Sequence, residues 1–270
     1  MYLKTEDVDL YYERTGEGQP MILIHGAVAD ADYFSESVPI LRKFYDVITY
    51  DRRGNSRSTP KEGATFQIAD QVKDVVALIE ALDLQQVILV GHSAGGEMAL
   101  ETFRVATSRI ARVILYETPL LSMITEQRPD MPEWIANMEA LNASGKHREV
   151  AKEFGLSIGV MDKRARKKNR DEKQKDRMNF GHFINHEFHA FSYYEPDIDF
   201  CRVNRDYITA VVGDGSEQTG SHLSLAMRIF AETVGCDLYH LAGFHNLPYD
   251  LPKDFVAGVL GILSVIEAKR

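Results

Sequence analysis

Short apolar runs, most of which lead into a glycine, histidine or acidic residue, are the feature of this sequence that most constrains its fold. They occur at 10–14, 21–24, 47–50, 87–90, 112–116, 207–213 and 236–241. Runs of this length and composition are typical of strands in a sheet. Between two of them, apolar residues recur every three or four positions from Ile68 to Leu82, which is typical of an amphipathic helix. The alternation predicts an α/β fold with a mostly parallel central sheet flanked by helices.

The strand pattern stops after Pro119 and resumes only near Arg205. We expect the segment between to be helical and to form a lid, 119–205, inserted after the sixth strand. The core then consists of 1–118 and 206–270, and an apolar-periodic helix from about 252 to 266 closes it. A chain of 270 residues with 44% hydrophobic residues can bury one such core and carry an insertion.

The formal net charge of −9 argues against polyanionic partners such as nucleic acid or anionic lipid. The two cysteines, Cys201 and Cys236, cannot make a disulfide framework, which favours a reducing compartment. No run approaches the roughly 18 apolar residues of a membrane span, and the first residues lack a signal-peptide pattern. The sequence predicts a soluble, cytoplasmic protein with a small-molecule partner, and it leaves a homodimer open.

A Gly-x-Ser-x-Gly motif at 91–95 lies directly after one apolar run and before a good helix former. A nucleophile on a sharp turn from strand to helix needs small neighbours, because the backbone comes close to itself there. The unpaired N–H groups of the following helix also favour negative charge at the serine. This placement predicts that Ser93 is a nucleophile.

A serine hydroxyl is a weak nucleophile and needs a base that takes its proton. His245 is the predicted base, because it follows the last expected strand and a loop could carry it to the carboxyl edge of the sheet. His25 also ends a strand, but it lies beside the loop expected to stabilise the oxyanion. His92 belongs to the turn itself and is expected to point away from Ser93.

The order of these motifs resembles that of the α/β-hydrolase superfamily. The shared features are a strand ending at His25-Gly26, the segment 51–58 with sequence Asp-Arg-Arg-Gly-Asn-Ser-Arg-Ser, the serine motif, and a late Gly-Phe-His at 243–245. The resemblance covers nearly the whole chain outside the expected lid, and it implies a serine hydrolase fold. The superfamily contains esterases, lactonases, thioesterases and carbon–carbon bond hydrolases, so a substrate does not follow from the fold.

The acid that orients the histidine is the point where this chain departs from the common pattern of that superfamily. The usual position, in a Gly-x-x-Asp pattern after the strand that follows the lid, holds Ser216 here, with Asp214 two residues earlier. Glu117, at the end of the strand before the lid, is the other candidate. Its placement resembles that in zearalenone lactone hydrolases and in one subgroup of haloalkane dehalogenases. We expect Glu117 to be the acid and keep Asp214 as the alternative.

The amides of Ala27 and Ala94 are the expected oxyanion donors, since the resemblance places one donor after His25-Gly26 and the other after the nucleophile. The predicted substrate pocket includes His25, His92, Trp134, Phe183 and Phe188. Three histidines, at 182, 186 and 189, recur at helical spacing, but no cysteine or carboxylate cluster lies with them in the sequence. We therefore predict no metal site.

Together these residues predict cleavage of a small ester or lactone through an acyl-enzyme, without a cofactor. Serine at the nucleophile position argues against epoxide hydrolase or dehalogenase chemistry, which passes through an ester to a carboxylate nucleophile. Carbon–carbon bond hydrolysis and a cofactor-free haloperoxidase-like activity remain alternatives. A non-catalytic ligand-binding protein on the same scaffold is a further one.

Overall fold

A single nine-stranded sheet forms the centre of the computed structural model, which describes residues 1–159 and 167–269. Its strand order is β1-β2-β4-β3-β6-β7-β8-β9, and the short β5 pairs with β2 off this path. The strands are β1 (Tyr2–Lys4), β2 (Val8–Thr15), β3 (Pro20–Ile24), β4 (Asp46–Tyr50), β5 (Thr59–Pro60), β6 (Val87–His92), β7 (Ile110–Tyr116), β8 (Ile208–Gly213) and β9 (Asp237–Leu241).

The strands from β4 to β9 along this order pair in parallel, whereas β1, β2 and β5 pair antiparallel. This confirms the predicted α/β fold with a mostly parallel sheet. The strands that the sequence did not predict, β1 and β5, are only three and two residues long, too short to show a hydrophobic period.

Helices cover both faces of the sheet. Alternate residues of one strand point to opposite faces, so Ile22 and Ile24 belong to one apolar cluster while Met21 and Leu23 belong to the other. The first cluster contains side chains of α2 (Ile68–Ala81), α3 (Ala94–Val105) and α10 (His222–Val234), and the second contains side chains of α12 (Pro252–Ala268). The remaining short helices near this second face are η1 (Ala31–Phe34), α1 (Val38–Leu41) and α11 (Leu247–Asp250).

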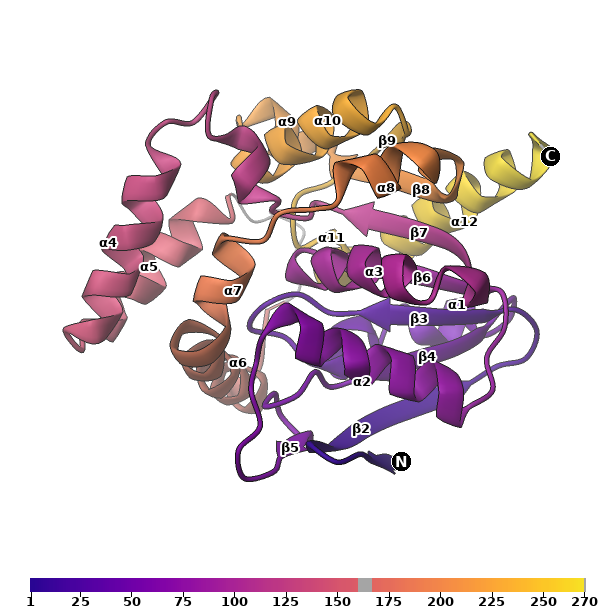
Figure 1. Ribbon diagram of the computed structural model, residues 1–270, viewed down its shortest axis with the longest axis horizontal. Helices are drawn as coiled ribbons and strands as arrows, with labels where there is room; N and C mark the ends of the chain where they lie inside the picture. The colour runs from indigo at the N-terminus through magenta and orange to yellow at the C-terminus, as the bar shows by residue number, and fades with distance from the viewer. Residues whose placement is uncertain (160–166, 270) are drawn as a thin grey trace.

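The segment between β7 and β8, which we call the helical insertion, contains no strand among its described residues. β7 is the sixth strand in chain order if the short β5 is left aside. Figure 1 shows most helices of the insertion, those of residues 131–157 and 170–192, beyond the carboxyl ends of the parallel strands. Its helices are η3 (Leu121–Ile124), α4 (Met131–Ala143), α5 (His147–Ser157), α6 (Arg170–His182), the π-helical turn η4 (Phe183–Glu187), α7 (Phe188–Ser192), α8 (Ile198–Val203) and η5 (Arg205–Tyr207).

Residues 160–166 of the expected lid lie outside the described residues. Within the described part of the chain, no helix is both long enough and apolar enough to cross a lipid bilayer.

Candidate active site

Ser93 occupies a sharp turn between β6 and α3. Its backbone has φ +54° and ψ −131°, a conformation that is strained for a residue with a side chain. The Ser93 N–H donates to the Tyr116 carbonyl at 2.9 Å, which anchors the turn to the neighbouring strand. The turn therefore holds the serine at the carboxyl edge of the sheet, where the active sites of α/β proteins gather.

Two glycines of the motif are required by close backbone contacts. A Cβ added to Gly95 would lie 2.2 Å from the carbonyl oxygen of Ile24, and one added to Gly91 would lie 2.5 Å from the Cα of Gly96. Backbone atoms cannot move aside as a flexible side chain could. The glycine pattern seen in the sequence thus has a steric cause in the packing of α3 against β3 and β6.

We expect Gly95→Ala to destabilise the fold by roughly 1–3 kcal/mol, because the added methyl group collides with the carbonyl oxygen of Ile24. Gly261→Ala is the matched control, since Gly261 lies inside α12 and its added Cβ meets nothing within 4 Å. That substitution should stabilise by roughly 0.5–1 kcal/mol, the helix penalty of glycine. Urea unfolding of both variants measures the difference, and equal midpoints would contradict the steric argument.

Glu117 and His245 are in direct contact. Glu117 follows β7 with φ +46°, and its Oε2 lies 3.0 Å from Nδ1 of His245. The Gly213 N–H donates to the other carboxylate oxygen at 2.8 Å, and the Ser216 hydroxyl donates to Oε2 at 3.1 Å. Both side chains of the pair are almost fully buried. The bond at Nδ1 leaves Nε2 of His245 as the nitrogen that can exchange a proton with a substrate or a hydroxyl group.

Asp214, the alternative acid, lies elsewhere. It is the first residue of α9 (Asp214–Gln218), its side chain is half exposed, and its Oδ1 lies 3.4 Å from Nδ1 of His240. The structure therefore brings Glu117, and not Asp214, to His245. Ser216 stands where the family's usual acid would be, and here it binds the carboxylate of Glu117.

His92 packs against His245. Its Nε2 lies 2.9 Å from the His245 carbonyl oxygen, and the two imidazole rings are 4.7 Å apart. Burial lowers the pKa of His92 well below its usual value, so the ring is neutral and Nε2–H can donate to that carbonyl. Tyr116 supports the same loop, because its hydroxyl donates to the Phe244 carbonyl at 2.8 Å.

The expectation that His25 lines the substrate pocket is wrong. Its ring is fully buried beneath the turn after β3, where Nε2 accepts the Arg52 N–H at 3.0 Å and Nδ1 lies 2.8 Å from the Gly26 carbonyl oxygen. Burial lowers its pKa to about 4. With both nitrogens bonded to backbone, His25 holds the loop that carries Ala27 and has no atom left for a ligand.

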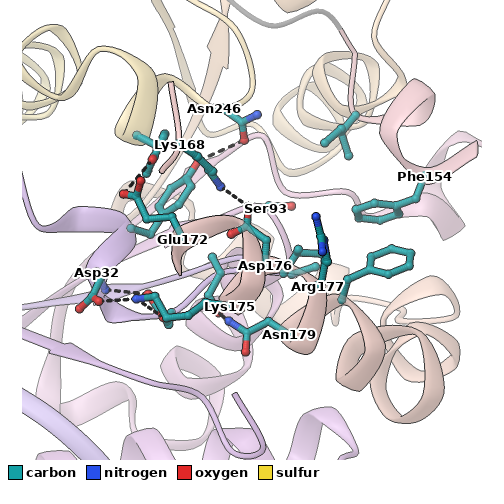
Figure 2. A pocket seen from close by; sticks show the side chains of 18 of the residues that line it. Asp32, Ser93, Phe154, Lys168, Glu172, Lys175, Asp176, Arg177, Asn179 and Asn246 are labelled. Carbon is teal, nitrogen blue, oxygen red and sulfur yellow. Dashed lines mark hydrogen bonds and ion pairs between the residues drawn. The ribbon is translucent and has the colours of Figure 1, made fainter. Parts of the chain in front are cut away.

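Two hollows meet at Ser93. The first, which we call the large cavity, has a volume of about 1010 Å³ and is lined by Ser93, His92, His245 and polar residues that include Asp30, Tyr33, Lys168, Glu172, Lys175, Asp176, Asn179, Asn246 and Tyr249. Figure 2 shows Ser93 at this cavity together with Lys175, Asp176 and Asn179 from α6.

The second, which we call the inner hollow, has a volume of only about 50 Å³. The predicted pocket residues Trp134, Phe183 and Phe188 line it, together with Ser93. Ala27 and Ala94 also line the inner hollow. Ala94 is the first residue of α3, so its N–H has no partner within the helix.

The sequence did not identify the polar wall that α6 gives to the large cavity. Its members Glu172, Lys175, Asp176 and Asn179 recur at spacings of three and four, which places them on one helix face and could have been noticed. Lys175 Nζ lies 3.0 Å from Asp30 Oδ2, and the Asn179 amide donates to the Ala29 carbonyl at 3.1 Å. These contacts attach the helical insertion to the loop after β3.

The three histidines at helical spacing do not share one site: His182 and His186 lie side by side, with ring centroids 5.1 Å apart, but His189 contacts other residues. His182 lies 3.6 Å from Glu187, His186 packs against Phe66, and His189 is exposed and contacts Glu139 at 2.7 Å. Across residues 1–159 and 167–269, no group of three or more His, Cys, Asp or Glu side chains is arranged to hold a metal ion.

Comparison with known proteins supports the fold and the motif order. The sequence pattern of the alpha/beta hydrolase fold family matches residues 19–147, which include the strand before Ala27 and the turn at Ser93. The chain has the α/β-hydrolase fold. A crystal structure from work on carboxylesterases of Nitrososphaera gargenis superposes on this α/β-hydrolase with a TM-score of 0.75 over 100% of both chains. At 18% sequence identity, that likeness shows the fold alone.

Curated relatives match about half of the α/β-hydrolase chain. The non-heme chloroperoxidase CPO-A1 of Kitasatospora aureofaciens is 34% identical over 130 residues, 46% of each chain. The bifunctional esterase/perhydrolase DCH of Acinetobacter calcoaceticus is 32% identical over 135 residues, 48% of this chain and 49% of its own. The match thus spans about half the length of these relatives.

Proposed function

We propose that this protein is a serine hydrolase that cleaves a carboxylic ester or lactone through an acyl-enzyme. The observation that carries the proposal is the buried contact between Glu117 and His245, together with the strained Ser93, which lines the same large cavity as His245. A carboxylate bonded to Nδ1 fixes the histidine tautomer and stabilises the imidazolium that forms during catalysis. If the pair of Glu117 and His245 served stability alone, a strained serine in the same cavity would have no explanation.

In the proposed reaction, Ser93 Oγ attacks the carbonyl carbon while His245 takes the hydroxyl proton. The amides of Ala27 and Ala94 donate to the oxygen that becomes negative, each contributing about 10²–10³ in rate. When the tetrahedral intermediate collapses, His245 gives the proton to the leaving oxygen. Water then attacks the acyl-enzyme, with His245 again taking a proton, and releases the acid and free Ser93.

The helical insertion is proposed to act as the cap of this site. It supplies α6 to the wall of the large cavity and the aromatic residues of α4, η4 and α7 to the inner hollow. The ion pair between Lys175 and Asp30 holds it over Ser93. A cap in this position reduces the access of bulk water and strengthens hydrogen bonds at the reacting carbonyl.

A second candidate, perhydrolysis, is favoured by the relatives named as a non-heme chloroperoxidase and as an esterase/perhydrolase. Hydrogen peroxide would replace water in the second step, attacking the acyl-enzyme to give a peracid and free Ser93. The same residues serve both reactions. Peracid formation from acetate ester and peroxide separates this activity from hydrolysis alone.

A fluorophosphonate probe tests the proposal, because it reacts covalently only with an activated serine. The wild-type protein should be labelled on the peptide that contains Ser93, as located by mass spectrometry, and Ser93→Ala should not be labelled. Ser144→Ala, which removes an exposed serine hydroxyl from the helical insertion, is the control and should label like the wild type. Folded wild-type protein that stays unlabelled would favour the ligand-binding alternative and overturn the proposal.

A further inference from the structure

We infer that the inner hollow receives the acyl group and the large cavity receives the leaving group, so that the substrate is an open-chain ester of a short acid with a larger, polar alcohol. The inference rests on the proposed serine-hydrolase function and adds a substrate class to it. Four observations carry it: the positions of His245 and Ala94, the sizes of the two hollows, their linings, and the wall formed by Trp134.

The orientation of the ester follows from the path of the proton. His245 lines the large cavity but is absent from the lining of the inner hollow, whereas Ser93 lines both. Because the histidine protonates the leaving oxygen, that oxygen must lie on the side of the large cavity. Of the two proposed oxyanion donors, Ala27 lines both hollows and Ala94 lines only the inner one, so the carbonyl oxygen lies next to the inner hollow. With the leaving oxygen on the side of the large cavity, the acyl substituent lies on the side of the inner hollow.

The difference in size limits the acyl group. The inner hollow, at about 50 Å³, is about one twentieth the size of the large cavity. The inner hollow therefore takes the smaller part of the substrate, a short acyl group. The large cavity, at about 1010 Å³, takes a much bigger leaving group. A macrocyclic lactone would have to turn its acyl chain back out of the inner hollow, which favours an open-chain ester.

The linings match this division. Apolar side chains dominate the inner hollow and suit an apolar acyl group. The large cavity also has apolar walls, formed in part by Phe154, Ile158 and Phe180, but it adds the charged side chains of Lys168, Glu172 and Lys175. These charged groups are held in ion pairs or hydrogen bonds, yet they border open space and suit an alcohol that carries several hydrogen-bonding groups.

Trp134 sets the length limit of the acyl group. Beyond the inner hollow lies an outer hollow of about 430 Å³, and Trp134, Ser157 and His222 line both. These three side chains therefore lie at the boundary between the two hollows. Trp134 is the largest of the three and packs against Phe188, with ring centroids 6.0 Å apart. Removing its indole ring would join the inner hollow to the outer one and make room for longer chains.

A series of p-nitrophenyl esters from acetate to hexanoate tests this inference, since only the acyl chain changes. In the wild type, kcat/KM should fall at least 10-fold from acetate to hexanoate, the lower limit for steric exclusion of added methylenes. In Trp134→Ala, the ratio of hexanoate to acetate should rise at least 10-fold. Tyr207→Ala, which removes an exposed aromatic ring that lines none of the three hollows, should keep the wild-type ratio.

Fluorophosphonate labelling of Ser93 distinguishes a failure of this inference from a failure of the proposed function. A wild type that is labelled at Ser93 but cleaves hexanoate as well as acetate overturns the division of the hollows and leaves the proposed function standing. An unlabelled wild type overturns the proposed function itself. If Trp134→Ala fails to fold, His222→Ala opens the same wall, and an unchanged ester ratio in that folded variant also overturns the inference.

Discussion

Glu117→Gln is expected to lower kcat by about 10⁴-fold on p-nitrophenyl acetate, the loss seen when the acid of a serine triad is replaced by its amide. In the wild type, the carboxylate of Glu117 accepts hydrogen bonds from Nδ1 of His245, the Gly213 N–H and the Ser216 hydroxyl. A glutamine amide can turn its NH₂ group toward Nδ1, which favours the wrong histidine tautomer. It also carries no charge to stabilise the imidazolium. The volume of the side chain is unchanged, so the fold should persist and the loss should appear in turnover.

Asp214→Asn is the matched control, because it makes the same change from carboxylate to amide on the other acid considered. Its side chain is half exposed and contacts His240, so kcat should stay within about twofold of the wild type. The opposite pattern, a loss of about 10⁴ in Asp214→Asn with near wild-type turnover in Glu117→Gln, would reassign the acid. Circular dichroism of both variants shows whether a loss of turnover reflects chemistry or unfolding.

The fold was predictable because its signal is local. Strands such as β3, β4 and β6 are short apolar runs, and α2 repeats its buried residues every three or four positions. The turn at Ser93 was predictable for the same reason, since the glycines that its packing requires are adjacent in sequence. Local patterns therefore identified the sheet and the predicted nucleophile together.

The partner of His245 could not be decided from the sequence, because the contact joins residues that are 128 positions apart. Glu117 and Asp214 both follow strands of the same sheet, and only the backbone conformations after β7 and β8 direct one carboxylate toward the histidine and the other away. The prediction that His25 lines the substrate pocket was wrong for a related reason. A histidine after a strand can face a pocket or the backbone, and the packing of Arg52 decides between them.

The buried ion pair between Arg52 and Glu187 had no sequence signal at all, since it joins residues 135 positions apart. Its side chains are fully buried, with Nη1–Oε1 at 2.8 Å and Nη2–Oε2 at 3.0 Å, and Gln71 binds both. Burial alone would raise the pKa of Glu187, but Arg52 lowers it to about 2, so the carboxylate is charged. Arg52 also donates to the Gly26 carbonyl at 3.3 Å. The pair thus links η4, which borders the inner hollow, to the loop that carries Ala27.

We expect Glu187→Leu to destabilise the protein by about 3–5 kcal/mol, because it leaves the Arg52 guanidinium buried without its counter-charge. For a chain of this size the melting temperature should fall by roughly 10 °C. Asp199→Leu is the control, since it removes the acidic partner of Arg202 from an exposed pair and should cost less than about 1 kcal/mol. The double variant Arg52→Met with Glu187→Leu should recover much of the loss, because neither charge then remains in the interior. A double variant no more stable than Glu187→Leu would mean that lost packing, and not the unpaired charge, causes the destabilisation.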